Sequence, residues 1–288
     1  MSQLGYLINQ MVNKTHKEGS YSARASRGKI LNLVAKELRE AGFKLNSPKG
    51  LKTKHVNHLV NHWQQRRLAD KTIKNRLSAL RWLAGKIDKR NIVCKSNDDY
   101  GILPIRSNPI GKSRELDMEK HGKITNEYVK LSLELQQAFG LRREEAIKFE
   151  LNYALRGDTL CLKGSWTKGG KERQIPITNE RQRQLLSKIK SFNNGASLIS
   201  STKSYVEQLK SYEYQTHKVG LSKNHGLRHH YARQRYQELT GWKCPASGGP
   251  SRKSLTSFQK HLDYNARMQI SKELGHERFS ITYTYLGS

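Results

Sequence analysis

Four short stretches of the sequence from residue 140 onward gather arginine, lysine, histidine and tyrosine. They are Gly140 to Glu145, Thr167 to Arg173, His225 to His229 and Leu274 to Tyr285. Side chains of these types, placed at turns and helix ends, can converge on a phosphate group. Guanidinium groups can hold the non-bridging oxygens of a phosphodiester under attack, and a tyrosine hydroxyl can supply the attacking oxygen. The stretches therefore predict chemistry at a phosphodiester.

The order of these motifs resembles a known family. Gly-Leu-Arg-Arg-Glu-Glu, Thr-Lys-Gly-Gly-Lys-Glu-Arg, His-Gly-Leu-Arg-His and Leu-Gly-His followed by a tyrosine resemble the signature set of the tyrosine recombinase or phage integrase family. The specific part is the pairing of His225 and Arg228 with His276 and Tyr285. By this resemblance the catalytic residues are Arg142, Lys168, His225, Arg228, His276 and Tyr285, with Glu145 in a supporting role.

The resemblance implies a role for each side chain. Tyr285 attacks the phosphorus, and because a phenol has a pKa of about 10, His225 or the field of the arginines must help it lose its proton. Lys168 protonates the departing 5′-oxygen, and His276 donates to a phosphate oxygen. The product is a covalent phosphotyrosine that conserves the energy of the broken bond. We therefore expect no cofactor and no metal.

The nucleophile and the lysine each have a rival. Tyr283 precedes Tyr285 by two residues and would point to another face of a helix, but the family's spacing from His276 selects Tyr285. Lys171 shares a turn with Lys168, and both could merely contact phosphates. We assign Lys168 to catalysis and Lys171 to DNA binding.

The first third of the sequence predicts three helices that carry basic residues away from their apolar faces. They span residues 22–43, 54–67 and 72–84. Residues 72–80 resemble the last helix of the family's SAM-like core-binding domain. We expect an all-α bundle whose Lys74, Arg76 and Arg81 contact DNA.

Helical periodicity fails between residues 89 and 122, where turn residues such as Gly101 and Pro109 are frequent. This predicts a multidomain chain with a core-binding domain at 1–95, a linker at 96–122 and a catalytic domain at 123–288.

The second domain reads as mostly helical α+β with a small β-sheet, which by resemblance is the DNA breaking-rejoining enzyme fold. Helices are expected at 126–138, 142–149, 181–189 and 229–239, with hairpin strands at 159–162 and 173–177. Pro176 indicates an edge strand because proline cannot donate a ladder hydrogen bond. We expect Arg173 to join Lys171 in contacting DNA, and residues 242–253 to form an ordered loop.

Charge supports a nucleic-acid partner. The 53 lysines and arginines against 24 acidic residues give a net charge of +29, spread along the whole chain.

No apolar run is long enough for a membrane span, and the region before Lys14 lacks a signal-peptide core, so we expect a cytoplasmic, nucleoid-associated protein. The three cysteines have no disulfide or zinc spacing. A zinc site from His229 or His230 with Cys244 would be short and irregular.

The resemblance as a whole implies a site-specific recombinase, or integrase, that acts on specific sites in double-stranded DNA and integrates or excises a mobile element. Exchange between two duplexes implies a homotetramer on DNA, with accessory factors left open. Two alternatives stand beside it: a type IB topoisomerase, and a non-catalytic architectural protein derived from a recombinase. The short region before the first predicted helix favours a two-domain form. The loop at 242–253 is the expected substitute for a tail that couples protomers.

Overall fold

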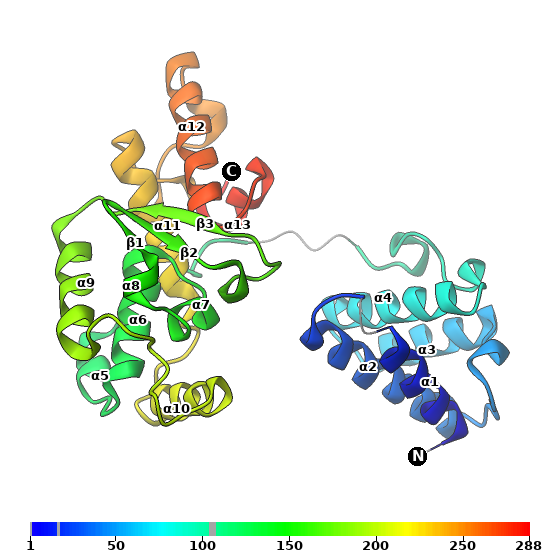
Figure 1. Ribbon diagram of the computed structural model, residues 1–288. Coiled ribbons are helices and arrows are strands. Elements are labelled where there is room, and N and C mark those ends of the chain that lie inside the picture. The colour runs from blue at the N-terminus through cyan, green and yellow to red at the C-terminus, as the bar shows by residue number, and fades with distance from the viewer. Residues whose placement is uncertain (1, 16–17, 104–107) are drawn as a thin grey trace. The chain divides into compact units, whose positions relative to one another are not determined.

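The chain forms two compact units in a computed structural model that describes residues 2–15, 18–103 and 108–288. The units are Met1–Arg106 and Ser107–Ser288 (Figure 1). Part of the predicted linker, residues 104–107, lies outside the described residues. We describe each unit by itself.

Over its described residues, the first unit is a bundle of four α-helices, as predicted for an all-α domain. Its helices are α1 (Gln3–Lys14), α2 (Tyr21–Glu40), α3 (Thr53–Gln65) and α4 (Asp70–Lys86). Their apolar faces meet in a core that includes the fully buried Leu31, Leu59, Trp63 and Leu77. Helix α1 is additional to the predicted set. It buries Leu4, Ile8 and Val12. In the sequence, the polar residues between these positions obscure the helical pattern.

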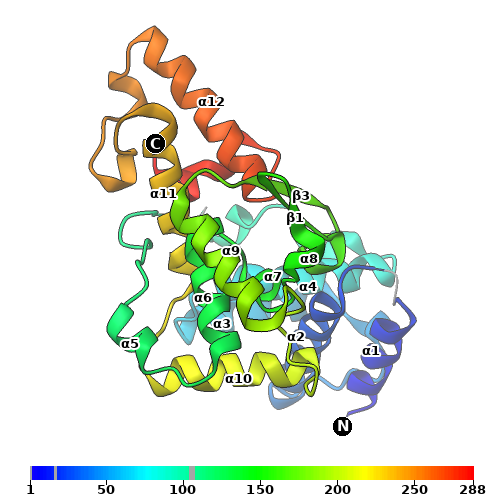
Figure 2. The same cartoon turned by 60° about the vertical axis from the view of Figure 1, so that its left-hand side comes forward.

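The second unit is mostly helical, with one small sheet (Figure 2). Its helices are α5 (Met118–Gly122), α6 (Glu127–Phe139), α7 (Arg143–Ile147), α8 (Leu151–Ala154), α9 (Glu180–Asn193), α10 (Tyr205–Lys218), α11 (His225–Thr240), α12 (Ser257–Glu273) and α13 (Tyr283–Leu286). This confirms the predicted α+β class. Helix α7 is shorter than predicted, and α5, α8, α10, α12 and α13 are additional.

The sheet has the strand order β1 (Leu155–Arg156), β2 (Thr159–Leu162) and β3 (Arg173–Pro176), with both pairs antiparallel. Leu160 pairs with Ile175, which fixes the register of the predicted hairpin. Strand β3 lies at an edge, as Pro176 indicated. The connection between β2 and β3 contains a 3-10 turn at Gly164–Trp166 and then the basic turn.

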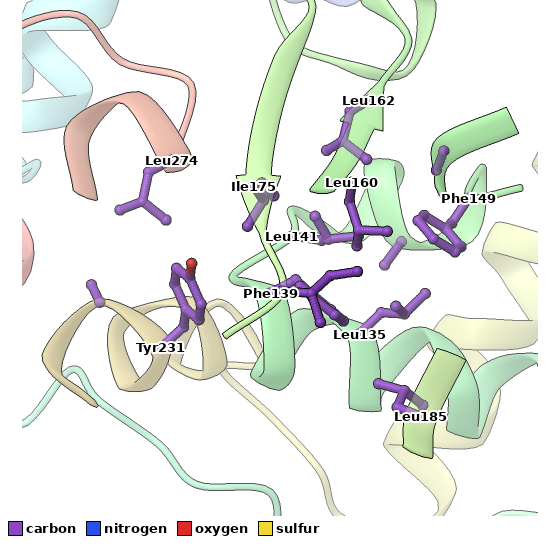
Figure 3. Packing of buried hydrophobic residues seen from close by; sticks show 14 of the residues in the cluster. Leu135, Phe139, Leu141, Phe149, Leu160, Leu162, Ile175, Leu185, Tyr231 and Leu274 are labelled. Carbon is purple, nitrogen blue, oxygen red and sulfur yellow. The ribbon is translucent and has the colours of Figure 1, made fainter. Parts of the chain in front are cut away.

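One apolar core lies between this sheet and the helices, as Figure 3 shows. Phe139 from α6, Leu160 from β2, Ile175 from β3 and Leu185 from α9 are buried there. Tyr231 from α11 joins the same cluster. The core therefore fixes the ends of α6, β3 and α11, which carry the candidate site.

Residues 242–253 are ordered, as predicted. They contain a 3-10 turn at Pro245–Ser247, and a second one, Arg252–Ser254, begins at their end. Part of the segment packs closely on Gly287. A Cβ at Gly287 would lie only 2.9 Å from the Ala246 nitrogen. No helix in the described part of the chain combines the length and apolarity of a membrane span.

Candidate active site

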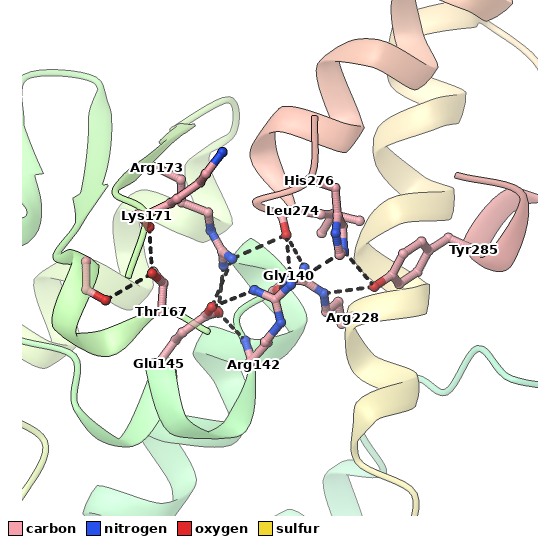
Figure 4. A network of polar contacts seen from close by, with 11 residues as sticks. Gly140, Arg142, Glu145, Thr167, Lys171, Arg173, Arg228, Leu274, His276 and Tyr285 are labelled. Carbon is pink, nitrogen blue, oxygen red and sulfur yellow. Dashed lines mark hydrogen bonds and ion pairs between the residues drawn. The ribbon is translucent and has the colours of Figure 1, made fainter. Parts of the chain in front are cut away.

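Tyr285 lies on the four-residue helix α13 with only 5% of its surface exposed. Its hydroxyl is 3.3 Å from Arg228 Nε, which donates to it, and 3.5 Å from His276 Nε2 (Figure 4). These two neighbours come from separate segments, the first turn of α11 and the turn that follows α12. Side chains from α11, from the turn after α12 and from α13 thus meet at one phenol oxygen.

Arg228 is fully buried and uses its remaining nitrogens on backbone carbonyls. Nη1 donates to the Gly140 carbonyl, and Nη2 donates to the Leu274 carbonyl. Burial lowers the pKa of Arg228. Gly140 has φ +61°, and a Cβ there would lie 2.5 Å from the Tyr231 ring, so this approach requires glycine.

Glu145 joins two further arginines. Its carboxylate accepts from Arg142 Nη1 at 2.8 Å and from the Arg142 backbone at 2.6 Å, and two Arg173 nitrogens donate to it at 3.0 and 2.7 Å. Burial alone would raise the pKa of Glu145, but Arg173, Arg228 and Arg142 hold it below its ordinary value. The side chain therefore stays ionised and fixes both arginines.

The environment of Arg173 differs from the DNA-facing one that we predicted. Arg173 is buried, and burial together with the charge of Arg228 lowers its pKa to about 10. Its two terminal nitrogens face Glu145 and the Leu274 carbonyl rather than solvent. A single sequence could not reveal this because the partner carboxylate lies on a different element. The geometry fits a residue that holds the site together.

The Leu274 carbonyl collects three guanidinium groups, which Figure 4 shows converging on one oxygen. Arg142 Nη2 lies 3.3 Å away and Arg173 Nη1 3.4 Å away, and Arg228 completes the set. Leu274 caps the carboxyl end of α12, where the helix dipole is negative. The next residue, Gly275, has φ +65°, and a Cβ there would lie 2.9 Å from Arg173 Nη1.

Of the two predicted histidines, His276 is the one that contacts the phenol. Its Nε2 also lies 3.4 Å from Arg142 Nη2. Burial, then the charges of Arg228 and Arg142, lower its pKa to about 4, so the ring is neutral near pH 7 and can accept a proton.

His225 is exposed and its ring lies 5.6 Å from that of His229. Partial desolvation and Arg228 lower the pKa of His225. His229, which the sequence suggested only as a metal ligand, packs its ring 4.6 Å from the Tyr285 ring. It lies next to Arg228 in sequence, and that adjacency was the one available signal for its position.

The predicted lysines occupy an exposed turn between β2 and β3. Lys171 forms a 2.9 Å ion pair with Glu277, a neighbour of His276. Lys168 is exposed and makes no hydrogen bond or ion pair within residues 2–15, 18–103 and 108–288. The turn is thus tied near the site through Lys171, while Lys168 extends from it.

The three side chains of the first unit that we predicted to contact DNA form hydrogen bonds or ion pairs within that unit. Arg76 forms a 3.0 Å ion pair with the buried Glu37, and Arg81 donates to the carbonyls of Cys94 and Ser96. Lys74 donates to the Leu103 carbonyl at 2.5 Å. These contacts indicate structural roles for Arg76 and Arg81 that composition and periodicity do not reveal.

The rival sites have different surroundings. Tyr283 packs on Phe279 at 5.5 Å, with the Arg267 guanidinium over its ring. Its side chain makes no hydrogen bond to the polar network around Tyr285 among the residues that the structure describes. Cys244 is buried and contacts Ser247. Over the described residues, no group of three or more His, Cys, Asp or Glu side chains could hold a metal ion.

Solved structures of DNA-bound enzymes share this fold at low sequence identity. The chain is similar to the Tn1549 transposon integrase in complex with circular intermediate DNA, with 13% identity, 100% of this chain and 96% of that chain covered, and a TM-score of 0.60. A lambda integrase dimer bound to a core site matches at 16% identity over 96% of each chain, with a TM-score of 0.57. XerH recombinase bound to difH matches at 16% identity over 98% of this chain and 80% of that one, with a TM-score of 0.55.

Sequence comparison assigns the family. No curated protein sequence matches the chain. One family model, described as phage integrase, N-terminal, matches residues 1–90, and another, described as integrase, matches residues 113–234. The second match includes Arg142, Lys168 and Arg228 and ends before His276 and Tyr285. With a match in each unit, and with the fold of solved integrases, this chain belongs to the phage integrase family of tyrosine recombinases.

Proposed function

We propose that this protein is a site-specific DNA recombinase that cleaves and rejoins strands through Tyr285. The observation that carries the proposal is the position of the Tyr285 hydroxyl, within 3.3 Å of a buried guanidinium and 3.5 Å of a neutral imidazole. A guanidinium stabilises the charge that develops on an attacking oxygen, and a neutral imidazole can take its proton. Family membership and the net charge of +29 support DNA as the substrate.

In the proposed reaction, the Tyr285 oxygen forms a bond to phosphorus and the bond from phosphorus to the 5′-oxygen breaks. The electron pair leaves with the 5′-oxygen, which takes a proton from Lys168 on its exposed turn. The phenol proton passes to His276, whose place beside the hydroxyl supports this role better than the position of His225 does. Arg142, the more accessible arginine of the network, binds the phosphate oxygens.

Rejoining reverses these bonds with a different 5′-hydroxyl as the attacking group. The covalent link to Tyr285 keeps the phosphoryl group activated, so the chain's own residues suffice for both steps. Exchange between two duplexes needs several protomers, and we propose a tetramer on DNA that integrates or excises a mobile element. Because the solved relatives are DNA complexes, we also propose a cytoplasmic, nucleoid-associated location.

The test is covalent capture. Duplexes that bind the full chain are selected from a random-sequence pool with the Tyr285→Phe protein, and a nick is then placed so that the cleaved fragment diffuses away. The wild-type protein should become attached to the DNA, as seen on a denaturing gel. Tyr285→Phe should abolish attachment and leave DNA binding intact.

Tyr283→Phe is the matched control and should attach at the wild-type rate. Attachment through Tyr283, or none by the wild-type protein, would refute the assignment. Joining of two selected duplexes would separate a recombinase from a topoisomerase, which relaxes supercoils without exchange. Binding without attachment would identify the architectural alternative.

A further inference from the structure

The segment that carries Tyr285 needs outside support to hold its shape. It consists of a 3-10 turn at Phe279–Thr282 followed directly by α13, and both elements have only four residues. A helix this short does not persist by itself, because nucleation costs more than so few hydrogen bonds return. The position of the Tyr285 hydroxyl must therefore come from contacts with the rest of the unit.

Arg267 supplies such a contact from the middle of α12. Its Nη1 donates to the Gly287 carbonyl at 2.9 Å and to Thr282 Oγ1 at 3.4 Å. One nitrogen thus bonds the residue before α13 and the residue after it. Thr282 also donates to the Phe279 carbonyl at 2.6 Å, which extends the hold to the start of the 3-10 turn.

The other side of Arg267 is fixed within its own helix. Nε donates to Asp263 at 2.7 Å, and Asp263 also accepts from the Tyr236 hydroxyl at 2.7 Å. Both charged side chains are essentially fully buried, with exposures of 0% for Arg267 and 1% for Asp263. The rings of Tyr236, Phe279 and Tyr283 lie 5.4 to 5.8 Å from the guanidinium carbon. This packing leaves the group little freedom to move.

A second arginine also contacts α13. Arg233 on α11 donates through Nε to the Tyr285 carbonyl at 3.3 Å and through Nη2 to the Pro109 carbonyl at 2.7 Å. Arg233 is only partly buried and its bond to α13 is longer, so Arg267 makes the stronger contact. Among the described residues, neither arginine forms a hydrogen bond to the Tyr285 hydroxyl, Arg142 or His276.

We propose that Arg267 is a positioning residue that holds Tyr285 in the active site of its own chain. The inference rests on the proposed function of Tyr285. It differs from a purely structural role in one respect: loss of the guanidinium should impair attack by Tyr285 and spare the phosphate-binding groups, which it does not touch. A misplacement of about 1 Å can cost about 100-fold in rate.

The experiment compares two nucleophiles on the same nicked, selected duplex. Attachment through Tyr285 is measured for wild-type, Arg267→Lys and Arg267→Met proteins. Hydrogen peroxide is then given to Tyr285→Phe and to Arg267→Met/Tyr285→Phe. Its hydroperoxide oxygen bonds to phosphorus and the 5′-oxygen leaves with the electron pair and a proton, so cleavage bypasses the tyrosine.

We expect Arg267→Met to slow attachment about 100-fold, while the peroxide rates of the two Tyr285→Phe proteins stay equal. Arg267→Lys should fall between wild type and Arg267→Met, because one ammonium cannot serve both Asp263 and the Gly287 carbonyl. Arg235→Met is the control. Arg235 is a mostly buried arginine on α11 whose partners are Glu273 and Glu238, and its loss should leave attachment near the wild-type rate.

Two results would overturn the inference. Equal attachment by Arg267→Met and wild type would show that α13 is held without Arg267. A parallel loss of peroxide cleavage in the double variant would show that Arg267 supports the whole fold or the phosphate site. If the wild-type protein never attaches while the peroxide reaction proceeds, the proposed function fails and the inference fails with it.

Discussion

The two units of this chain differ in where they keep their charges. The first unit has an apolar core, and its buried ionisable side chains within the described residues are Glu37 and His55. The second unit buries a series of charged side chains: Glu145, Arg173, Arg228, Arg235, Asp263, Arg267 and Glu273. Burying an ion costs several kcal/mol unless a partner compensates it. The second unit therefore depends on matched polar partners in addition to its apolar core, whereas the first depends mainly on apolar packing.

This contrast follows from what each unit has to position. A site that must hold guanidinium groups at fixed points cannot rely on flexible surface arginines, whose ion pairs contribute little. The second unit fixes its arginines with a buried carboxylate and with the carbonyls of Gly140 and Leu274. We expect single polar substitutions to be more damaging there than in the first unit, whose core is apolar.

The largest effect is expected from Arg228→Lys. Arg228 contacts the Tyr285 hydroxyl and two carbonyls at once, and a single ammonium cannot reproduce that geometry. Loss of one preorganised donor costs about 100- to 1,000-fold in rate. The initial rate of covalent attachment at saturating protein measures this loss.

Arg235→Lys is the control, because it also replaces a buried guanidinium on α11 with an ammonium group. It should retain most of the attachment rate, because Arg235 pairs with Glu273 and Glu238 and not with Tyr285. If Arg228→Lys attaches as fast as Arg235→Lys, the polar core around Tyr285 has no special role in catalysis.

The next effect concerns stability. Glu145→Gln removes the charge that compensates Arg142 and Arg173, and leaving buried charges unpaired costs about 3–5 kcal/mol. Hydrogen exchange in α6 and β2 of the full chain, followed by mass spectrometry, reports the opening free energy of this unit.

Glu144→Gln is a closely matched control, because Glu144 precedes Glu145 and forms an exposed ion pair with Lys148. Its loss should cost less than about 1 kcal/mol. Similar protection in the two variants would mean that Glu145 does not compensate the arginines and that the contrast between the units is wrong.

Much of this arrangement could be anticipated from the sequence. Helical periodicity gave the class of both units, and the motif order gave Arg142, Arg228, His276 and Tyr285, which the structure brings together. What remained hidden depends on pairing across elements. Arg173 reads as a basic strand residue, since its carboxylate partner is 28 positions away. Residue types also do not show which backbone carbonyls, such as that of Leu274, accept hydrogen bonds from side chains.

Arg267 shows the same difficulty within one helix. Asp263 and Arg267 are four residues apart, a spacing that in a sequence describes an ordinary surface ion pair. The structure buries the pair because the 3-10 turn and α13 fold over that face of α12. Burial of a charge is a property of the tertiary fold, and the local pattern does not contain it.

For the first unit we predict that Leu80→Ala costs about 2–5 kcal/mol in local stability, because the fully buried side chain leaves a cavity among packed helices. Hydrogen exchange in α4 measures the loss. Leu103→Ala is the control, since Leu103 is 70% exposed and its truncation should change stability by less than about 0.5 kcal/mol. Equal effects would contradict the apolar character of this core. Protection in β2 of the second unit should be unchanged.

The smallest effect is expected from acid titration of the second unit. His229 and His276 each have a pKa lowered from 6.5 to about 4, mainly by burial and then by neighbouring positive charge. Between these values the unfolded chain binds more protons than the folded one, so stability rises with pH in this window. Thermal midpoints at constant ionic strength should therefore fall as the pH drops from 6.5 to 4. His229→Gln and His276→Gln should each flatten part of that slope. A midpoint that rises on acidification would mean that these imidazoles gain protons on folding, which the cluster of arginines around His276 opposes.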